Sequence, residues 1–253
     1  AHINDVDHNN INALQRACFS NNLNVARYLI NHGATFSSEA QKNRSLFNAV
    51  KRGNINTIKF LINECGLNVN AKNSEHEGQT LLMIACEKDD PEFITKLLDM
   101  GVKIDEQDNN GQTAVMKCCL LGKVHNMMAL IKRGAKIDIC DNKNENAFHK
   151  SAKNNTPNGH TAFLTLLATL KDKDVINILD TKDNEKNVWH IAMDYKNNQV
   201  AEYLRKSLSP LDFKYLVRNE DNRQIKEAYN TLITSPAEIS NDTQLTSRPT
   251  GPC

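Results

Sequence analysis

A repeated pattern of apolar and small residues runs along most of the chain. In each occurrence a large apolar residue is followed, three positions later, by a small one. The large residues are Leu14, Leu46, Leu82, Val115, Phe148 and Trp189, and the small residues are Ala17, Ala49, Ala85, Cys118, Ser151 and Ala192. Successive large residues lie 32, 36, 33, 33 and 41 positions apart. This self-similarity predicts a chain built from stacked repeats.

A second apolar stripe, at helical spacing, follows the first in most repeats. It covers residues 25–30, 58–62, 94–98 and 128–131, and these stretches lead to Gly33, Gly66, Gly101 and Gly134. Glycine readily adopts the left-handed conformation that ends a helix, so the pattern predicts a second helix that stops at each glycine. Two short helices cannot bury their apolar faces alone, and neighbouring repeats must therefore stack.

The repeats resemble ankyrin repeats. Residues 78–86 read GQTLLMIAC and residues 111–119 read GQTAVMKCC, which is similar to the family pattern D-x-x-G-x-T-P-L-H-x-A-A. The resemblance covers residues 7–206. It implies an all-α ankyrin-repeat solenoid of about six helix-turn-helix repeats, each opened by a β-turn finger.

The repeats depart from the family pattern at several positions. None has the motif proline, and only His149 and His190 keep the motif histidine; Gln15, Phe47, Met83 and Met116 replace it. Repeat two has Glu39 and Lys42 where a finger has aspartate and glycine, so we expect residues 37–42 to be helical. In repeat five the glycine expected three residues after Ala152 is found seven residues after it, as Gly159. This spacing predicts an insertion of about four residues around positions 154–158.

Beyond residue 206 the repeat pattern is no longer recognisable. Ser209 and Pro210 read as the N-cap and first residue of a helix, and short apolar stripes begin at Phe213 and Ile225. We therefore expect a C-terminal helical cap at residues 207–233. Residues 234–253 are rich in Ser, Thr, Pro and Asn, which predicts a disordered tail.

Composition narrows the functional classes. The formal net charge is +1, from 31 basic and 30 acidic residues, so there is no general attraction to nucleic acid or to a membrane surface. No apolar run approaches the roughly 18 residues of a membrane span. The seven cysteines are odd in number and form no C-x-x-C pair, which favours buried thiols in a reducing compartment. We expect a cytoplasmic protein with no cofactor and no bound metal.

Two groups of residues could suggest catalysis. Cys118 and Cys119 with His149 would supply a thiol and a base. However, Cys118 stands at the small-residue position and His149 at the motif histidine, so we interpret them as structural. Four aspartates fall in predicted fingers, where aspartate accepts backbone hydrogen bonds: Asp105, Asp108, Asp138 and Asp141. Trp189 stands at a leucine position and is expected in the core. We predict no enzymatic activity in this chain.

The resemblance implies where a partner would bind. Ankyrin-repeat proteins usually grip partners with their finger tips and with the residues that end the first helix of each repeat. The positions expected to contact a partner are Phe19, Lys51, Arg52, His76, Glu77, Gln79, Glu87, Lys88, Asn109, Asn110, Gln112, Leu120, Leu121, Lys143 and Lys153. The same rule adds His8, Asn9, Ile11 and Ser20 in repeat one, and Asn142 and Glu145 in repeat five.

Leu120 and Leu121 distinguish repeat four, because these two positions are usually polar when nothing binds there. Either Leu121 packs inward or both leucines are apolar anchors on a concave face. We therefore predict a monomeric protein-interaction module (scaffold, adaptor or inhibitor) whose partner is another protein and neither nucleic acid nor membrane. Degenerate repeats enriched in Asn, Ile and Lys also resemble ankyrin effectors that intracellular bacteria secrete into the host cytosol, and amoebal and other protist proteins look similar. The alternative is the targeting portion of a larger enzyme whose catalytic domain lies outside this chain.

Overall fold

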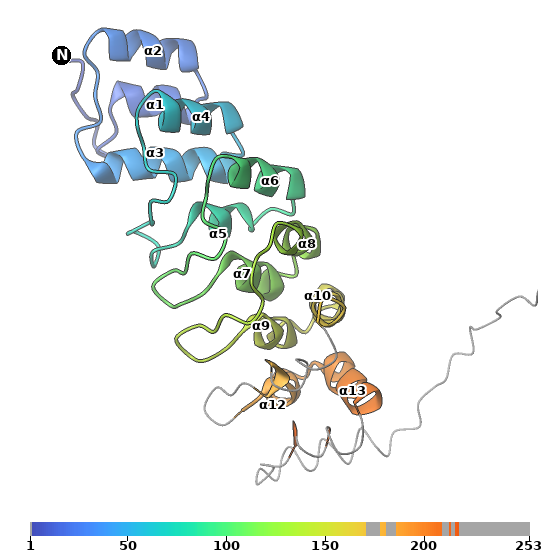
Figure 1. Ribbon diagram of the computed structural model, residues 1–253. Coiled ribbons are helices and arrows are strands. Elements are labelled where there is room, and N and C mark those ends of the chain that lie inside the picture. Colours follow the sequence, from blue (N-terminus) through green and yellow to red (C-terminus); the bar gives the residue numbers. More distant parts are fainter. Residues whose placement is uncertain (1, 171–177, 181–185, 209–212, 214–215, 218–253) are drawn as a thin grey trace, which may run out of the picture. The chain divides into compact units, whose positions relative to one another are not determined.

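The computed structural model describes residues 2–170, 178–180, 186–208, 213 and 216–217 (Figure 1). Within these residues the chain is helical, with two isolated β-bridges and no strand. The helices form pairs, which confirms the all-α repeat fold predicted from the sequence. The chain divides into a unit of residues 1–219 and a second unit, residues 220–253, that lies outside the described residues.

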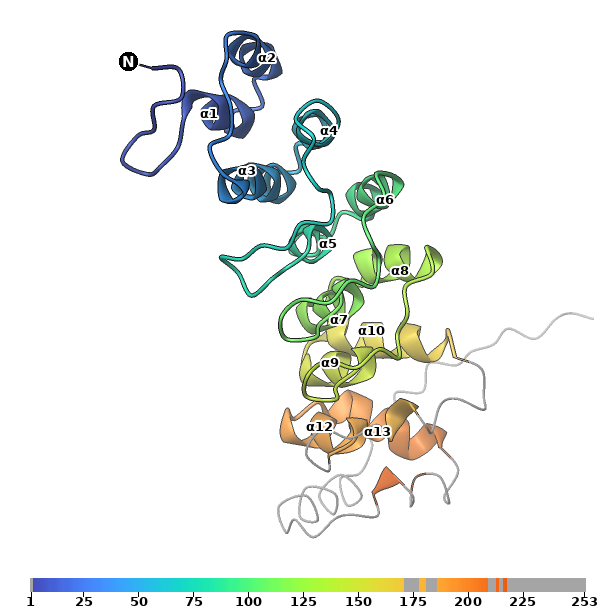
Figure 2. The same cartoon turned by 60° about the vertical axis from the view of Figure 1, so that its left-hand side comes forward.

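Each repeat contributes an inner helix and an outer helix. The inner helices are α1 (Ala13–Phe19), α3 (Glu39–Arg52), α5 (Leu81–Ala85), α7 (Ala114–Leu121), α9 (Ala147–Lys153) and α12 (Val188–Asp194). The outer helices are α2 (Leu23–Asn31), α4 (Ile55–Asn63), α6 (Pro91–Asp99), α8 (Val124–Lys132), α10 (Pro157–Leu167) and α13 (Asn198–Ser207). Every inner helix packs on the next inner helix and on its own outer helix, so the repeats form two layers (Figure 2).

The core lies between these layers, where the repeated apolar residues point. Leu82 and Phe148 have no exposed surface, and Val115 and Trp189 are 1% exposed. The prediction that these four residues are buried is therefore confirmed. Small residues such as Ala85 and Cys118, also buried, follow three positions after Leu82 and Val115. Their lack of bulk allows successive inner helices to approach closely.

Capping residues set where the helices begin and end. The side chain of Thr80 accepts a hydrogen bond from the backbone of Met83, and Thr113 caps α7 in the same way. Such caps satisfy backbone N–H groups that have no partner inside the helix. At the other end, the glycines predicted to stop the second helices all have positive φ, from 68° at Gly66 to 89° at Gly33 and Gly134. The predicted helix ends are thus confirmed.

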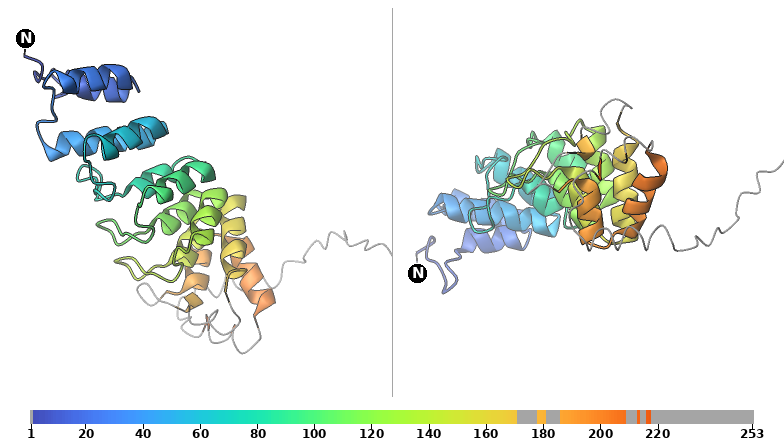
Figure 3. Two further views of the ribbon diagram at one scale, coloured as in Figure 1. Left: turned by 45° about the horizontal axis from the view of Figure 1, so that its top comes forward. Right: turned by 90° about the horizontal axis from the view of Figure 1, so that it is seen from below.

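Fingers connect the repeats and project from one side of the inner helices (Figure 3). Each is closed by a backbone hydrogen bond from its first residue to its last, at 2.9–3.0 Å. They are finger one (residues 7–11), finger three (73–79), finger four (108–112) and finger five (141–145). The first residue, Asp7, Asn73, Asp108 or Asp141, accepts backbone hydrogen bonds through its Oδ1 atom. This is the structural role predicted for Asp108 and Asp141.

Repeat two has no such finger. Helix α3 starts at Glu39 behind an N-cap from Ser38 and runs for 14 residues, whereas α1 has seven and α7 eight. The prediction that residues 37–42 are helical is therefore confirmed from residue 39 onward. The additional turns of α3 occupy the stretch of sequence that forms a finger in repeats three to five.

The turn predicted in repeat five is wrong. Gly159 lies inside α10, which begins at Pro157 behind an N-cap from Thr156. Asn154, not a glycine, ends α9, and it does so with φ −84° and ψ 94°. The additional residues mainly lengthen the second helix, to 11 residues against nine in α8. Gly159 is required there because a Cβ atom would lie 1.9 Å from the carbonyl oxygen of Asn154.

The predicted C-terminal cap falls mostly outside the described residues, and the predicted tail falls there entirely. Of the cap, Phe213 and Leu216 are buried. The ring of Phe213 meets that of Trp189 edge to face, with centroids 5.9 Å apart. The carbonyl of Leu216 accepts a 2.6 Å hydrogen bond from Asn187. These contacts cover the inner helix of the last described repeat.

Candidate partner-binding surface

Fingers three, four and five are joined into one ladder. The backbone N–H of Asn109 donates to the carbonyl of Glu77 at 2.9 Å, and that of Asn142 donates to the carbonyl of Asn110 at 3.0 Å. The side chain of Asn110 also donates to Glu77 Oε2 at 2.7 Å. The finger tips therefore present a connected polar edge, with each finger held by its neighbour.

The predicted finger residues divide into exposed and half-buried positions. The exposed ones are His76, Glu77, Asn109, Asn110, Asn142 and Lys143. Gln79 and Gln112, which end their fingers next to the inner helices, are half-buried. His8 and Asn9 of finger one are exposed and Ile11 is half-buried. These side chains could contact a partner, except where the next finger already engages them.

The inner-helix ends form the second part of the surface. Lys51, Arg52, Glu87 and Lys88 are exposed, as is Ser20, and Phe19 is half-buried. Leu120 is 37% exposed and Leu121 is 41% exposed. Of the two alternatives for Leu121, the structure thus gives the exposed one. Helix α7 ends at Leu121, and Gly122 with φ 66° follows as its C-cap. Because the helix ends here, both leucine side chains lie outside the core.

Lys117 lies one helical turn before these leucines on the same face of α7, because residues three and four apart are neighbours on a helix. It is half-buried. In repeats one and five the residue at this position pairs with the first aspartate of its finger, through Arg16 and Asp7 or Lys150 and Asp141. No ion pair of Lys117 is found in the described part of the chain. Its charge is therefore available beside the two leucines.

The expectation that Glu145 contacts a partner is wrong. Its side chain has no exposed surface and pairs with Lys150 Nζ at 2.5 Å and with Lys153. Burial would raise the pKa of the Glu145 carboxyl, but hydrogen bonds from both lysines outweigh burial and lower the pKa to about 2. Lys153 is 14% exposed at its side chain, and its ammonium group lies 5.5 Å from the centre of the Tyr195 ring. Lys153 therefore has more of a structural role than the sequence indicates.

The buried role of Lys150 was not predicted from the sequence. Burial lowers the pKa of Lys150, but hydrogen bonds to Asp141 and Glu145 outweigh burial and raise it above its ordinary value. The available signal was the spacing: Lys150 follows Asp141 by nine residues, as Arg16 follows Asp7. That spacing indicates a pair between finger and inner helix, although it does not tell how deeply the pair is buried.

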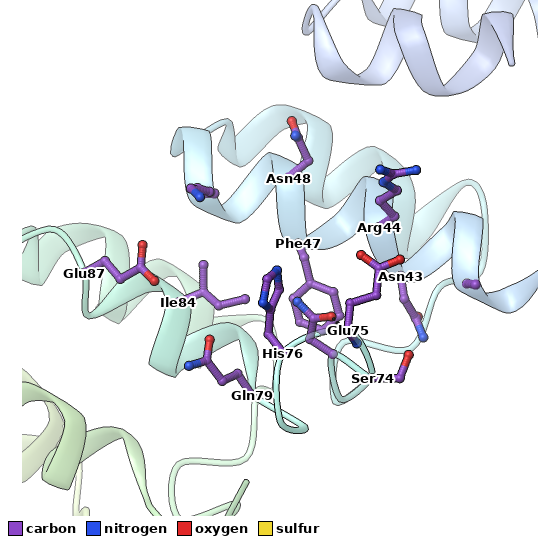
Figure 4. Close-up of a pocket in the computed structure, with 13 residues that line it drawn as sticks. Asn43, Arg44, Phe47, Asn48, Ser74, Glu75, His76, Gln79, Ile84 and Glu87 are labelled. Carbon is purple, nitrogen blue, oxygen red and sulfur yellow. Dashed lines mark hydrogen bonds between the residues drawn. The ribbon is translucent and has the colours of Figure 1, made fainter. Parts of the chain in front are cut away.

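Four predicted residues from two repeats line one cavity. Lys51 of α3, His76 and Gln79 of finger three, and Glu87 surround a hollow of about 410 Å³ (Figure 4). Its other lining residues include Phe47 and Ile84, which are 6% and 7% exposed. This cavity lies beside the position where repeat two lacks a finger. The surface therefore has a polar cavity in repeats two and three in addition to the leucine pair of repeat four.

The cysteine and histidine side chains considered for catalysis serve packing and capping. Cys118 and Cys119 are buried, and the sulfur atoms of Cys118 and Cys86 are in contact at 2.7 Å. Burial raises the pKa of the Cys118 and Cys119 thiols above the ordinary value, so both remain protonated near neutral pH. The Nδ1 atom of His149 accepts a hydrogen bond from the backbone of Asn146 at the start of α9. This arrangement matches the structural interpretation of these residues.

None of the helices in the described ranges is long and apolar enough to cross a lipid bilayer. No curated protein matches the sequence significantly. The family model for ankyrin repeats in three copies matches residues 1–73, 46–141 and 82–177, which together span more than half of the chain. The paired helices, the glycine-ended outer helices and the hydrogen-bonded fingers are the structural counterpart of that match. The chain therefore belongs to the ankyrin-repeat family, whose members are generally protein–protein interaction modules.

Proposed function

We propose that this chain binds a partner protein through its inner-helix ends and finger tips, with the contact centred on Leu120 and Leu121 of repeat four. The observation that carries the proposal is the exposure of these adjacent leucines, at 37% and 41%. A large apolar side chain on the surface contributes little to folding, and a cluster of them marks an interaction surface.

The surroundings of the leucine pair support the proposal. Glu87 and Lys88 hold the corresponding positions of repeat three and are exposed. Finger four, which begins at Asp108, precedes α7 and contributes exposed amides at Asn109 and Asn110. An apolar centre within a polar rim is the usual layout of a protein interface. The free charge of Lys117 favours a partner that carries a carboxylate next to its apolar contact residue.

The test compares two substitutions that each replace an exposed apolar residue by aspartate. Leu120→Asp places a charge at the proposed centre, and Val25→Asp places one on α2, where Val25 is 43% exposed. Proteins captured from a cell lysate by the wild-type chain are identified by mass spectrometry, and the affinity of a purified candidate is then measured by calorimetry. Leu120→Asp should weaken binding by about 1–2 kcal/mol or more, as at interface centres, and Val25→Asp should not.

Circular dichroism should show that both variants are folded, because substitutions at exposed positions should change stability by no more than about 0.5 kcal/mol. A difference in affinity can then be assigned to the binding surface. Unchanged affinity in a folded Leu120→Asp variant would place the contact elsewhere. Equal losses in both variants would indicate a non-specific effect of the added charge. Neither a role as a secreted effector nor one as the targeting portion of an enzyme is favoured by a particular structural observation, so protein binding alone is proposed.

A further inference from the structure

The missing finger of repeat two changes the hydrogen bonding on both sides of it. The carbonyl oxygen of Asn9 in finger one holds the position of the Asn110 oxygen in finger four. The latter accepts from the next finger at 3.0 Å. Asn9 instead accepts from the guanidinium of Arg44 at 3.2 Å, and the carbonyl of Asn10 accepts from the Gln41 side chain at 3.3 Å. Side chains of α3 thus replace the missing finger on the side of finger one.

On the other side, finger three has no such replacement. Ser74 follows the first residue of finger three, as Asn109 and Asn142 follow the first residues of fingers four and five. The backbone N–H groups of Asn109 and Asn142 donate to the preceding finger. The Ser74 N–H makes no hydrogen bond among the described residues. The ladder of fingers therefore begins with an open donor at Ser74.

This open edge borders the 410 Å³ cavity between α3 and finger three, which we name the finger-two gap. Figure 4 shows side chains of α3 and finger three on either side of it, with Phe47 of α3 pointing into the space between them. Its α3 wall carries Arg44 and Lys51, and the opposite side carries Glu75 and Glu87. The gap is thus lined by the apolar side chains of Phe47 and Ile84, by basic residues of α3 and by acidic residues on the side of finger three.

We propose that the finger-two gap holds an extended segment of a partner protein that continues the finger ladder. A backbone carbonyl of that segment accepts from the Ser74 N–H. An acidic side chain of the segment pairs with Arg44 or Lys51, and a basic one pairs with Glu75 or Glu87. The inference rests on the proposed role in protein binding, and it specifies a second contact with its own chemistry.

The charge distribution selects this occupant over other classes. A nucleic acid or a free phosphate would be drawn to Arg44 and Lys51 but repelled by Glu75 and Glu87 across the same gap. A peptide backbone supplies the carbonyl that the ladder lacks, and its side chains can carry both signs of charge. Addition of an extended peptide to an open backbone edge is a recurring mode of recognition, in which main-chain hydrogen bonds give affinity and side-chain pockets give specificity.

The experiment uses a library of short random peptides displayed on phage and selected on the whole chain. Enriched peptides are synthesised and their dissociation constants are measured by calorimetry. Ser74→Pro removes the N–H donor, and Ser74→Ala, which keeps it, is the matched control. We expect Ser74→Pro to raise the dissociation constant about tenfold, as loss of a hydrogen bond in an interface does, and Ser74→Ala to change it less than about twofold.

Two further variants keep the proposal testable if Ser74→Pro disturbs finger three. Ala40 is exposed and lines the gap, so Ala40→Trp should fill the cavity and abolish peptide binding. Lys51→Glu should remove the preference for acidic residues among the enriched peptides without affecting folding, because Lys51 is exposed.

The outcomes separate this inference from the proposed function. Peptides that lose binding with Ala40→Trp but keep it with Leu120→Asp support the gap, whatever binds at repeat four. Peptides that lose binding with Leu120→Asp but not with Ala40→Trp overturn the gap and leave the leucine site standing. Failure to enrich any peptide, or enriched peptides indifferent to Ala40→Trp, Ser74→Pro and Lys51→Glu, overturns the inference.

Discussion

Lys150 and Asp141 form an ion pair in the interior of repeat five. Lys150 Nζ lies 2.5 Å from Asp141 Oδ2, and only 4% and 2% of the two side chains are exposed. Arg16 and Asp7 hold the corresponding positions in repeat one, but there 61% and 24% of the side chains are exposed. The chain therefore contains the same contact in a buried and in a largely exposed setting, and the two can be compared directly.

Lys150→Met should destabilise the protein by about 3–5 kcal/mol, because it leaves Asp141 buried without a cation and leaves Glu145 with Lys153 alone. Arg16→Met removes the corresponding cation at the surface and should cost no more than about 1 kcal/mol. Urea unfolding followed by circular dichroism measures both. Similar small losses in the two variants would mean that water reaches the carboxylates of repeat five and replaces the lysine.

The same cluster predicts how stability changes in acid. The pKa of Glu145 is lowered from 4.5 to about 2 by the hydrogen bonds of Lys150 and Lys153, despite its burial. Since the folded-state pKa lies below the unfolded value, Glu145 stabilises the fold fully above about pH 4.5, and this contribution is lost as the pH falls toward 2. Wild-type protein should therefore lose more unfolding free energy between about pH 7 and pH 3 than Glu145→Gln does. Parallel losses would show that other carboxylates cause the acid sensitivity.

Leucine-to-alanine substitutions in adjacent repeats test the division between core and surface. Leu82 has no exposed surface and Leu121 is 41% exposed. Leu82→Ala should cost about 2–5 kcal/mol, since it leaves a cavity between stacked repeats. Leu121→Ala should cost no more than about 0.5 kcal/mol. Thermal and urea unfolding of the pair gives the comparison, and a loss below about 0.5 kcal/mol for Leu82→Ala would contradict the assigned repeat frame.

The fold could be predicted because the same pattern of large apolar and small residues recurs in every repeat. Leu82, Val115 and Phe148 hold the large apolar position of their repeats, and all three are buried in the structure. The helical entry of α3 could also be predicted, because Ser38 is a good N-cap residue and the finger aspartate and glycine are absent. The turn in repeat five was predicted wrongly, because Gly159 is needed there to leave room for the Asn154 carbonyl and not to adopt positive φ.

The candidate surface was less predictable for a physical reason. Whether a finger residue is exposed depends on the charged side chains of the helix that follows the finger. Glu145 can be buried because Lys150 and Lys153 of α9 neutralise its charge. Position within a finger says nothing of this. The finger-two gap likewise results from a relationship between α3 and finger three. Lys51, His76, Gln79 and Glu87, which the sequence predicts as partner contacts, line one cavity, but their convergence could not be read from the sequence.

The contact between fingers four and five yields a last prediction. Gly111 has φ +76°, and a Cβ atom there would lie 2.6 Å from Asn142 Oδ1 and 2.8 Å from the Asn142 backbone nitrogen. Gly134 has φ +89°, but apart from its chain neighbours no described residue has an atom within 4 Å of its Cβ position. Alanine is strained at both positions by about 1–3 kcal/mol. Gly111→Ala must in addition displace Asn142, so it should cost at least about 1 kcal/mol more than Gly134→Ala.

A local measurement distinguishes the added clash from the shared backbone strain. The N–H of Asn142 donates to the Asn110 carbonyl at 3.0 Å and links the two fingers. Hydrogen exchange at Asn142 should therefore become faster in Gly111→Ala and remain at the wild-type rate in Gly134→Ala, because only the first substitution pushes that N–H away. If both variants lose the same stability and neither changes this exchange rate, the close approach of fingers four and five does not constrain position 111, and the finger ladder is looser in solution than the hydrogen bonds indicate.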